Sequence, residues 1–142
     1  MVHALEEAHR VLRPGGLLID LRPAPAHRQL GIGVGRTWQF VGQLHEVLDD
    51  DLAADAAVRE LVREGLLQPE RRVRFQLDRV MDSLEDVRDF LADFDQRRNL
   101  PAHTKLLDQL QARYQRLPAP DKFSIRGPMH LALLRKPEDS AT

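Results

Sequence analysis

The chain has 142 residues, a net charge of −1 and no cysteine. This length suits one domain, over 1–142, that buries a core without metal or disulfide support. The absence of cysteine excludes disulfide frameworks, thiolate metal sites and cysteine nucleophiles, and it favours a cytoplasmic location. The balanced charge and the absence of an apolar run of ~18 residues lead us to expect neither nucleic acid nor a membrane as a partner.

The first predicted elements are a helix over 2–12 and a strand over 16–22. Apolar residues of the helix recur at helical spacing, namely Val2, Leu5, Ala8 and Leu12. Pro14-Gly15-Gly16 ends the helix, because proline and glycine interrupt helical hydrogen bonding. Residues 17–21 of this strand are almost wholly apolar, which is typical of a strand covered on both faces.

The middle of the chain predicts two strands, a helix and a third strand. Apolar residues alternate with glycine at the start of 29–43, and Gly35-Arg36 suits a two-residue hairpin turn before a second strand. A helix is expected over 46–66. Residues 71–80 alternate between apolar and polar side chains, as strands do.

The C-terminal part predicts helices over 83–97 and 102–117, separated by a break at Asn99-Leu100-Pro101. Ser83 and Asp86 have the spacing of a capping box at the start of the first of these helices. Residues 122–126 and 129–135 predict two strands around Gly127-Pro128, either an antiparallel hairpin or one strand with a bend. Residues 136–142 are expected to form a frayed tail.

Residues 4–19, centred on Arg10-Val11-Leu12-Arg13-Pro14-Gly15-Gly16, resemble one place in class I S-adenosylmethionine-dependent methyltransferases. In that family a helix ends in Arg-Val-Leu-Lys/Arg-Pro-Gly-Gly and leads into the fifth strand of the central sheet. A variable region, helices and an antiparallel pair of closing strands follow it.

The resemblance implies an α/β fold with a partial Rossmann-like methyltransferase sheet made of its last three strands. The sheet would hold residues 16–22, 122–126 and 129–135. The predicted helices 2–12, 83–97 and 102–117 would flank this sheet. A variable or lid region over 23–80 would contain an accessory antiparallel β-unit, built from 29–43 and 71–80.

The resemblance also implies S-adenosylmethionine as the cofactor, held in the family by a glycine-rich loop and an acidic residue upstream of the Pro-Gly-Gly segment. Only the residues before Pro14 lie upstream here. The glycine pattern over 31–35 lies downstream and precedes a predicted strand, whereas cofactor-binding glycine loops open a helix. We therefore expect a truncated member that lacks the cofactor-binding half and is not catalytic alone.

The alternative hypothesis is a non-catalytic dimerisation or small-molecule-binding module derived from that fold. Under either hypothesis, the unpaired edge of the strand over 16–22 predicts a homodimer that covers it. We assign no catalytic residue and no metal ligand, because the six histidines are scattered without metal-ligand spacing.

Four residues are candidates for contacting a small-molecule methyl acceptor, by analogy with the family's substrate-facing region: Arg22, His27, Trp38 and Phe40. The competing interpretation for the two aromatic residues is that they pack an accessory sheet against Phe75. A lone hairpin needs such an apolar face to be stable.

Overall fold

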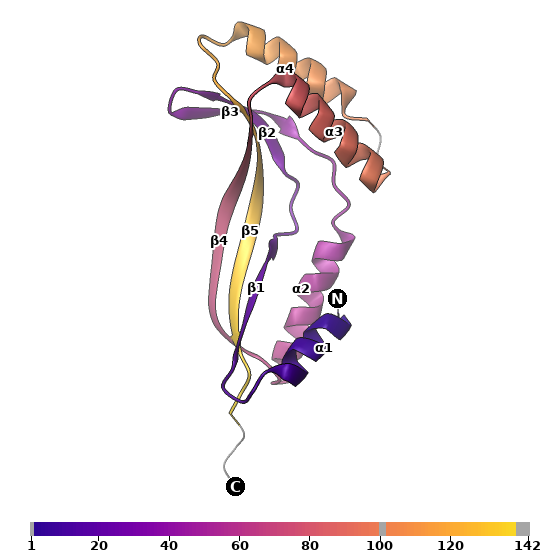
Figure 1. The fold of residues 1–142 in the computed structure, drawn as a ribbon, viewed down its shortest axis with the longest axis vertical. Coiled ribbons are helices and arrows are strands. Elements are labelled where there is room, and N and C mark those ends of the chain that lie inside the picture. The colour runs from indigo at the N-terminus through magenta and orange to yellow at the C-terminus, as the bar shows by residue number, and fades with distance from the viewer. Residues whose placement is uncertain (1, 100–101, 139–142) are drawn as a thin grey trace. The chain divides into compact units, whose positions relative to one another are not determined.

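The computed structural model describes residues 2–99 and 102–138 (Figure 1). Its elements are α1 Val2–Val11, β1 Leu17–Pro23, β2 Gln29–Val34, β3 Thr37–Gln43, α2 Asp49–Arg63, β4 Gln68–Met81, α3 Leu84–Arg98, α4 Thr104–Arg116 and β5 Phe123–Arg135. Of the predicted features, Leu100-Pro101 and the tail from residue 139 onward lie outside the described residues.

The chain divides into two compact units. Unit 1 comprises residues 1–25, 48–75 and 128–142, and unit 2 comprises residues 26–47 and 76–127. Both units contain segments that are distant in sequence, and the expectation of a single domain stays a prediction.

The fold is α/β, as predicted, with a five-stranded antiparallel sheet. The strand order is β1-β5-β2-β3, and β4 also pairs with β5. In unit 1, β5 pairs with β1 over seven residues of each strand. In unit 2, β5 pairs with β2, and β2 pairs with β3.

Of the two alternatives for the C-terminal residues, the structure has the single strand, Phe123–Arg135, so the hairpin around Gly127-Pro128 and the two separate sheet strands over 122–126 and 129–135 were wrong. The physical reason lies in the register. The neighbour of β5 changes from β2, which pairs as far as Arg126, to β1, which pairs from Met129 onward. Pro128 falls between these two paired stretches, and its carbonyl accepts the Ala24 amide N–H at 2.9 Å.

The predicted accessory β-unit was also wrong, since residues 29–43 and 71–80 do not form a separate sheet. The hairpin joins β5 through β2, and β4 pairs with β5. Leu30 and Ile32 are fully buried and lie opposite Ile125 and Phe123. The apolar side of the hairpin is therefore buried through β5.

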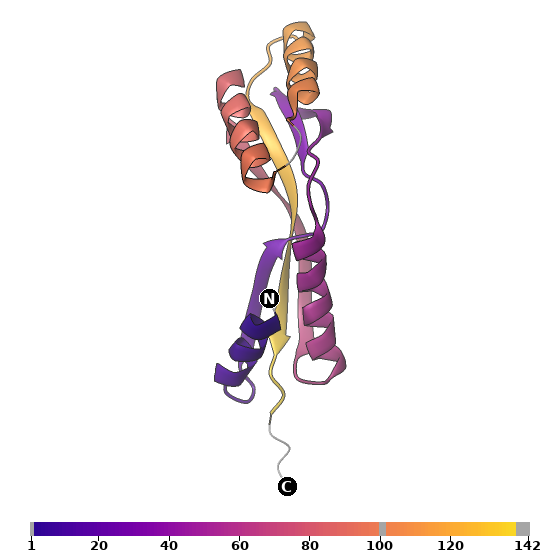
Figure 2. The ribbon, with the colours of Figure 1, turned by 90° about the vertical axis from the view of Figure 1, so that its right-hand side faces the viewer.

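Unit 1 has helices on one face of its strands, and α2 runs alongside them in both views (Figure 1 and Figure 2). Its buried cluster includes Val58 and Leu61 of α2, Ala132 and Leu134 of β5, and Leu67, with Leu5 and Leu18 packed against it. Burying these aliphatic side chains fixes α1 and α2 to the sheet.

Unit 2 has a larger core, in which α3 and α4 pack on β2 and β5. The fully buried side chains of this core come from both helices, both strands and the segment after β3: Leu30, Ile32, Leu44, Val87, Leu91, Leu110, Phe123 and Ile125.

The helix predicted over 46–66 begins at Asp49 and ends at Arg63. Residues 44–48 are not helical. Leu44 is fully buried and donates its amide N–H to the Arg28 carbonyl at 2.9 Å. Glu46 binds Arg28 through its carboxylate. These contacts hold the segment extended, so tertiary packing overrides its helical pattern.

The Pro-Gly-Gly turn joins α1 to β1 by specific bonds. Gly15 adopts a φ of +74°, which favours glycine, and donates its N–H to the Lys136 carbonyl at 3.0 Å. The Lys136 ammonium donates to the carbonyls of His9 and Leu12, both at 2.9 Å. It thereby satisfies carbonyls at the end of α1 that lack helical partners.

Across residues 2–99 and 102–138, no helix combines the length and apolar character needed to cross a membrane.

Candidate functional site

The four residues predicted to contact an acceptor do not gather in one unit. Arg22 belongs to unit 1, whereas His27, Trp38 and Phe40 belong to unit 2. Each is therefore described in its own surroundings.

Arg22 lies in a largely buried polar cluster of unit 1. Its Nε donates to both carboxylate oxygens of Asp20 at 3.0 Å. Its Nη1 is 2.5 Å from Asp55 Oδ1 as an ion pair, without hydrogen-bond geometry. His130 Nε2 lies 3.4 Å from Asp20 Oδ2. The Arg22 side chain is only 12% exposed, and its guanidinium pairs with the carboxylates of Asp20 and Asp55 within unit 1.

Trp38 is held from several sides in unit 2. Its indole Nε1 donates to Ser124 Oγ at 2.8 Å. The Arg126 guanidinium lies 4.3 Å from its ring centroid, which is a cation–π contact. The ring also covers Gly31, where an added Cβ would stand 2.2 Å from Trp38 Cε2. Trp38 thus packs the hairpin and β5, whereas Phe75, its expected partner, belongs to unit 1.

Phe40 and His27 are more open to a ligand. Phe40 is 47% exposed, and its ring centroid is 6.3 Å from that of Trp38. His27 is exposed, and its Nδ1 accepts the Glu46 amide N–H at 3.2 Å. Of the four predicted residues, Phe40 therefore has the apolar side chain that is most accessible to a ligand.

Asp78 and Arg126 form an ion pair beside Trp38. Arg126 Nε and Nη2 donate to the two Asp78 oxygens, each at 2.8 Å. These hydrogen bonds hold the pKa of Asp78 below its ordinary value, against a smaller opposing effect of partial burial. The same bonds raise the pKa of Arg126. Both groups stay charged at neutral pH, and the guanidinium is fixed over the indole.

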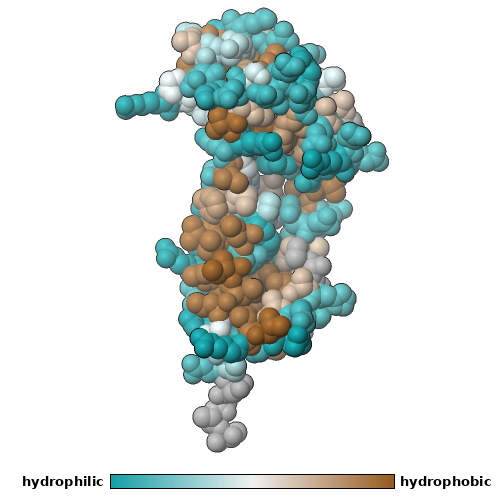
Figure 3. Space-filling view, viewed as in Figure 1, coloured by the Kyte–Doolittle hydropathy of each residue, from teal (hydrophilic) through white to brown (hydrophobic). Residues whose placement is uncertain are grey.

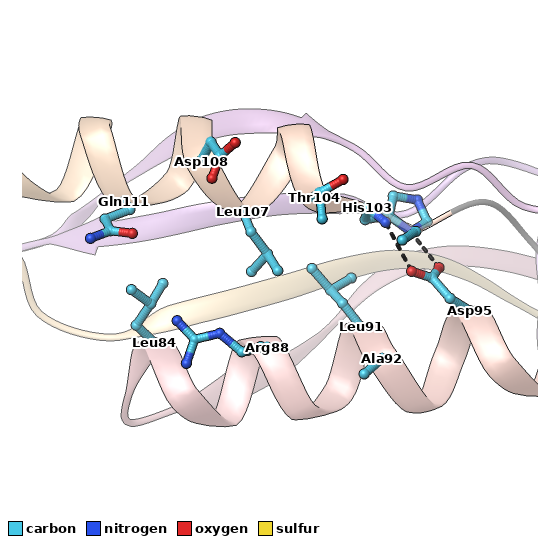
Figure 4. Close-up of a pocket in the computed structure, with 11 residues that line it drawn as sticks. Leu84, Arg88, Leu91, Ala92, Asp95, His103, Thr104, Leu107, Asp108 and Gln111 are labelled. Carbon is cyan, nitrogen blue, oxygen red and sulfur yellow. Dashed lines mark hydrogen bonds and ion pairs between the residues drawn. The ribbon is translucent and has the colours of Figure 1, made fainter.

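The structure also shows a cavity of about 360 Å³ between α3 and α4, drawn in Figure 4. Leu84, Leu91 and Leu107 give it apolar walls, and the Arg88 side chain extends between the two helices. Asp95 and His103 lie at one end of it. This volume is within the roughly 300–1,000 Å³ range of small-molecule sites.

Asp95 and His103 form a buried carboxylate–imidazole pair, the arrangement that orients a general base in many enzymes. His103 Nδ1 lies 2.5 Å from Asp95 Oδ1, and the His103 amide N–H donates to Asp95 Oδ2 at 2.9 Å. His103 Nε2 accepts the amide N–H of His45 at 3.0 Å. Because both ring nitrogens are occupied, the pair fastens the α3–α4 connection to the segment after β3.

The sequence analysis missed this pair, although a signal was available. Asp95 continues the i, i+4 series of the buried residues Val87 and Leu91, so it lies on the apolar side of α3. A carboxylate at such a position needs a buried partner. Within residues 2–99 and 102–138, no three His, Asp or Glu side chains are grouped closely enough to hold a metal ion.

Comparisons with protein-family models, curated proteins and solved structures found no match to this chain.

Proposed function

We propose that these residues form the substrate-side, C-terminal part of a class I S-adenosylmethionine-dependent methyltransferase, and that they do not transfer methyl groups alone. The observation that carries the proposal is the segment over 4–19. It folds as helix α1, a Pro-Gly-Gly turn and strand β1, which is the order that the resemblance implies.

The surroundings of β1 support the same proposal. The resemblance implies a closing strand pair at the C-terminal end of the fold. In unit 1, the last strand, β5, lies beside β1 and is antiparallel to it. A second strand, β4, pairs with β5. This pair replaces the two short strands expected over 122–135.

The glycines over 31–35 do not fit S-adenosylmethionine. Gly31 and Gly33 belong to β2, and Gly35 lies in the turn to β3. The turn therefore opens a strand, whereas the glycine loops that bind phosphates and cofactors open a helix. The Trp38 ring also covers Gly31, so a ligand cannot approach that backbone closely. We derive no catalytic step through the cofactor.

On the acceptor side, we propose Phe40 as the residue that contacts a small-molecule methyl acceptor, with Trp38 as its fixed support. The exposure of Phe40 beside a half-buried indole supports this assignment. Arg22 and His27 remain proposals of the resemblance, and the Arg22 charge already has internal partners. We also propose a cytoplasmic location, supported by the absence of cysteine.

The experiment is a calorimetric titration of S-adenosylmethionine into the purified chain. We expect no binding heat at ligand concentrations up to about 1 mM, because a dissociation constant above that value corresponds to less than ~4 kcal/mol of binding free energy. S-adenosylhomocysteine serves as the matched ligand, since it keeps every group except the methyl. Micromolar binding of either ligand would overturn the claim that these residues lack a cofactor site.

The second candidate function is a non-catalytic module for small-molecule binding or dimerisation. The cavity between α3 and α4 favours small-molecule binding over dimerisation, because a ligand there would meet apolar walls and the Arg88 guanidinium. A thermal-shift screen of small amphipathic carboxylates tests it. A saturable rise in melting temperature that Arg88→Gln abolishes would favour this candidate, and no shift would count against it.

A further inference from the structure

The cavity between α3 and α4 lies within unit 2 and has an apolar middle. Leu84 and Leu91 of α3 and Leu107 of α4 point into the space between the two helices (Figure 4). Leu91 is 1% exposed, and Leu84 and Leu107 are half-buried. By contrast, hydrophobic side chains elsewhere on the molecule gather on an open surface, as over the strands of unit 1 in Figure 3. The cavity can therefore cover an apolar chain from two sides.

The Asp95–His103 pair at one end of the cavity has its bonding groups in use. Both Asp95 carboxylate oxygens bond to His103, and the second ring nitrogen of His103 accepts the His45 amide N–H. Both side chains of the pair are buried. A charged ligand group at this end would lose water without gaining a partner, which costs free energy. An apolar chain terminus suits this end better.

Arg88 supplies a positive charge on the other side of Leu91. Its side chain is exposed, and within residues 2–99 and 102–138 it has no ion-pair or hydrogen-bond partner. Figure 4 shows it extending into the space between the helices, away from the Asp95–His103 pair. A guanidinium presents a planar fork of N–H donors that matches a carboxylate. The charge of Arg88 is thus available to an anionic group of a ligand.

Asp108 also lines the cavity, from α4. Figure 4 shows it level with the α4 ribbon, whereas Leu107 points into the space between the helices. Its negative charge repels anions, so a ligand with one carboxylate fits this cavity better than one with two.

We propose that the cavity binds a straight-chain monocarboxylate, with its carboxylate on Arg88 and its alkyl chain along Leu91 toward the Asp95–His103 pair. Arg88 and Asp95 lie about 10 Å apart along the α3 axis, at about 1.5 Å per residue. About eight carbon atoms, joined by single bonds of about 1.5 Å, span this distance. The inference deepens the second candidate function and does not depend on the methyltransferase proposal.

Calorimetric titration of the purified chain with n-alkyl carboxylates, from butanoate to dodecanoate, tests the proposal. The affinity should rise about fourfold for each added methylene, because each one buries apolar surface. The rise should stop at about ten carbons, once the cavity is full. Octan-1-ol should bind at least tenfold more weakly than octanoate, because it lacks the charge that Arg88 binds.

Three variants assign the contacts. Arg88→Gln should weaken octanoate binding at least tenfold and leave octan-1-ol binding unchanged. Asp108→Asn should strengthen octanoate binding, because a repelling charge is removed. Arg113→Gln is the matched control, since Arg113 is an exposed arginine of α4 outside the cavity. All three positions are exposed, and melting temperatures report whether each variant folds.

Octanoate binding that depends on chain length, is lost in Arg88→Gln and is kept in Arg113→Gln supports the proposal. Equal affinities for octanoate and octan-1-ol, or an equal loss in both arginine variants, overturn the carboxylate assignment and leave the second candidate function standing. If none of these probes binds at concentrations up to about 10 mM, a dissociation constant well above the millimolar range overturns both.

Discussion

At the scale of single residues, the contact between Gly31 and Trp38 explains the glycine pattern over 31–35. The ring lies where a Cβ on residue 31 would stand. Glycine is therefore required here by close packing, and the same packing keeps ligands away from this backbone. A glycine pattern that resembles a cofactor loop is thus explained by an aromatic side chain seven residues later.

Replacing Gly31 by alanine tests this explanation. The added methyl group would stand 2.2 Å from Trp38 Cε2, so the indole must move and its bond to Ser124 must lengthen. We expect Gly31→Ala to lower the free energy of unfolding by about 1–3 kcal/mol, as overpacking does. Urea denaturation measures it.

Gly33→Ala is the control on the same strand, because its nearest neighbour would be 3.4 Å away. Equal stability of the two variants would contradict the packing role of Gly31.

The Asp78–Arg126 pair predicts a pH dependence of stability. Its bonds hold the pKa of Asp78 below the unfolded value of about 3.9. The stabilisation is therefore fully present above pH ~5 and is lost as the pH falls through the folded pKa. Because both side chains are about one-third exposed, we expect about 1 kcal/mol or less at pH 7.

Unfolding titrations of wild type and Asp78→Asn between pH 2 and 7 measure this effect. The difference in unfolding free energy should shrink as the pH falls below the unfolded pKa of about 3.9 and through the lowered folded pKa of Asp78. Asp89→Asn, which removes an exposed carboxylate elsewhere on unit 2 and leaves the ion pair intact, is the matched control. If the difference in unfolding free energy between wild type and Asp78→Asn stays constant down to pH 2, the Asp78–Arg126 pair is not the cause of that difference.

At the scale of elements, helix α3 begins at a capping box. Ser83 Oγ accepts the Asp86 amide N–H at 3.0 Å, and Asp86 Oδ2 accepts the Ser83 amide N–H at 3.1 Å. We expect Ser83→Ala to cost about 1 kcal/mol of unfolding free energy. Asp86→Ala should cost a similar amount, and the double variant should cost less than the sum, because the two bonds support one turn. Strict additivity in urea denaturation would show that they act independently.

Elements whose boundaries depend on local chemistry were predictable from the sequence. The capping box, the two-residue turn at Gly35-Arg36 and the Pro-Gly-Gly turn each lie where their residues require. Their signals act within a few residues along the chain. Helix α1 and the hairpin were found for the same reason.

Pairing between distant segments was not predictable in this way. For β5 the sequence left a hairpin and one bent strand as alternatives, because Gly127-Pro128 resembles a turn. The change of its neighbour from β2 to β1 depends on residues that are distant in sequence. The start of α2 was missed because Arg28 holds Glu46 across 18 residues of sequence. Phe40 and Trp38 were named by analogy with the family's substrate-facing region, and their role stays a prediction. The Asp95–His103 pair was missed because its two members lie on separate elements.

At the scale of the whole molecule, the proposed lineage rests on the resemblance of residues 4–19 to a methyltransferase segment. In the structure these residues form α1, the Pro-Gly-Gly turn and the first part of β1.

The reading frame immediately upstream of the codon for Met1 tests the central claim most directly. If these residues are the substrate-side part of a methyltransferase, sequencing the gene region should reveal an in-frame segment coding for an apolar strand, a glycine-rich loop and a helix. An upstream region closed by stop codons in this frame, with no such segment, would contradict the account.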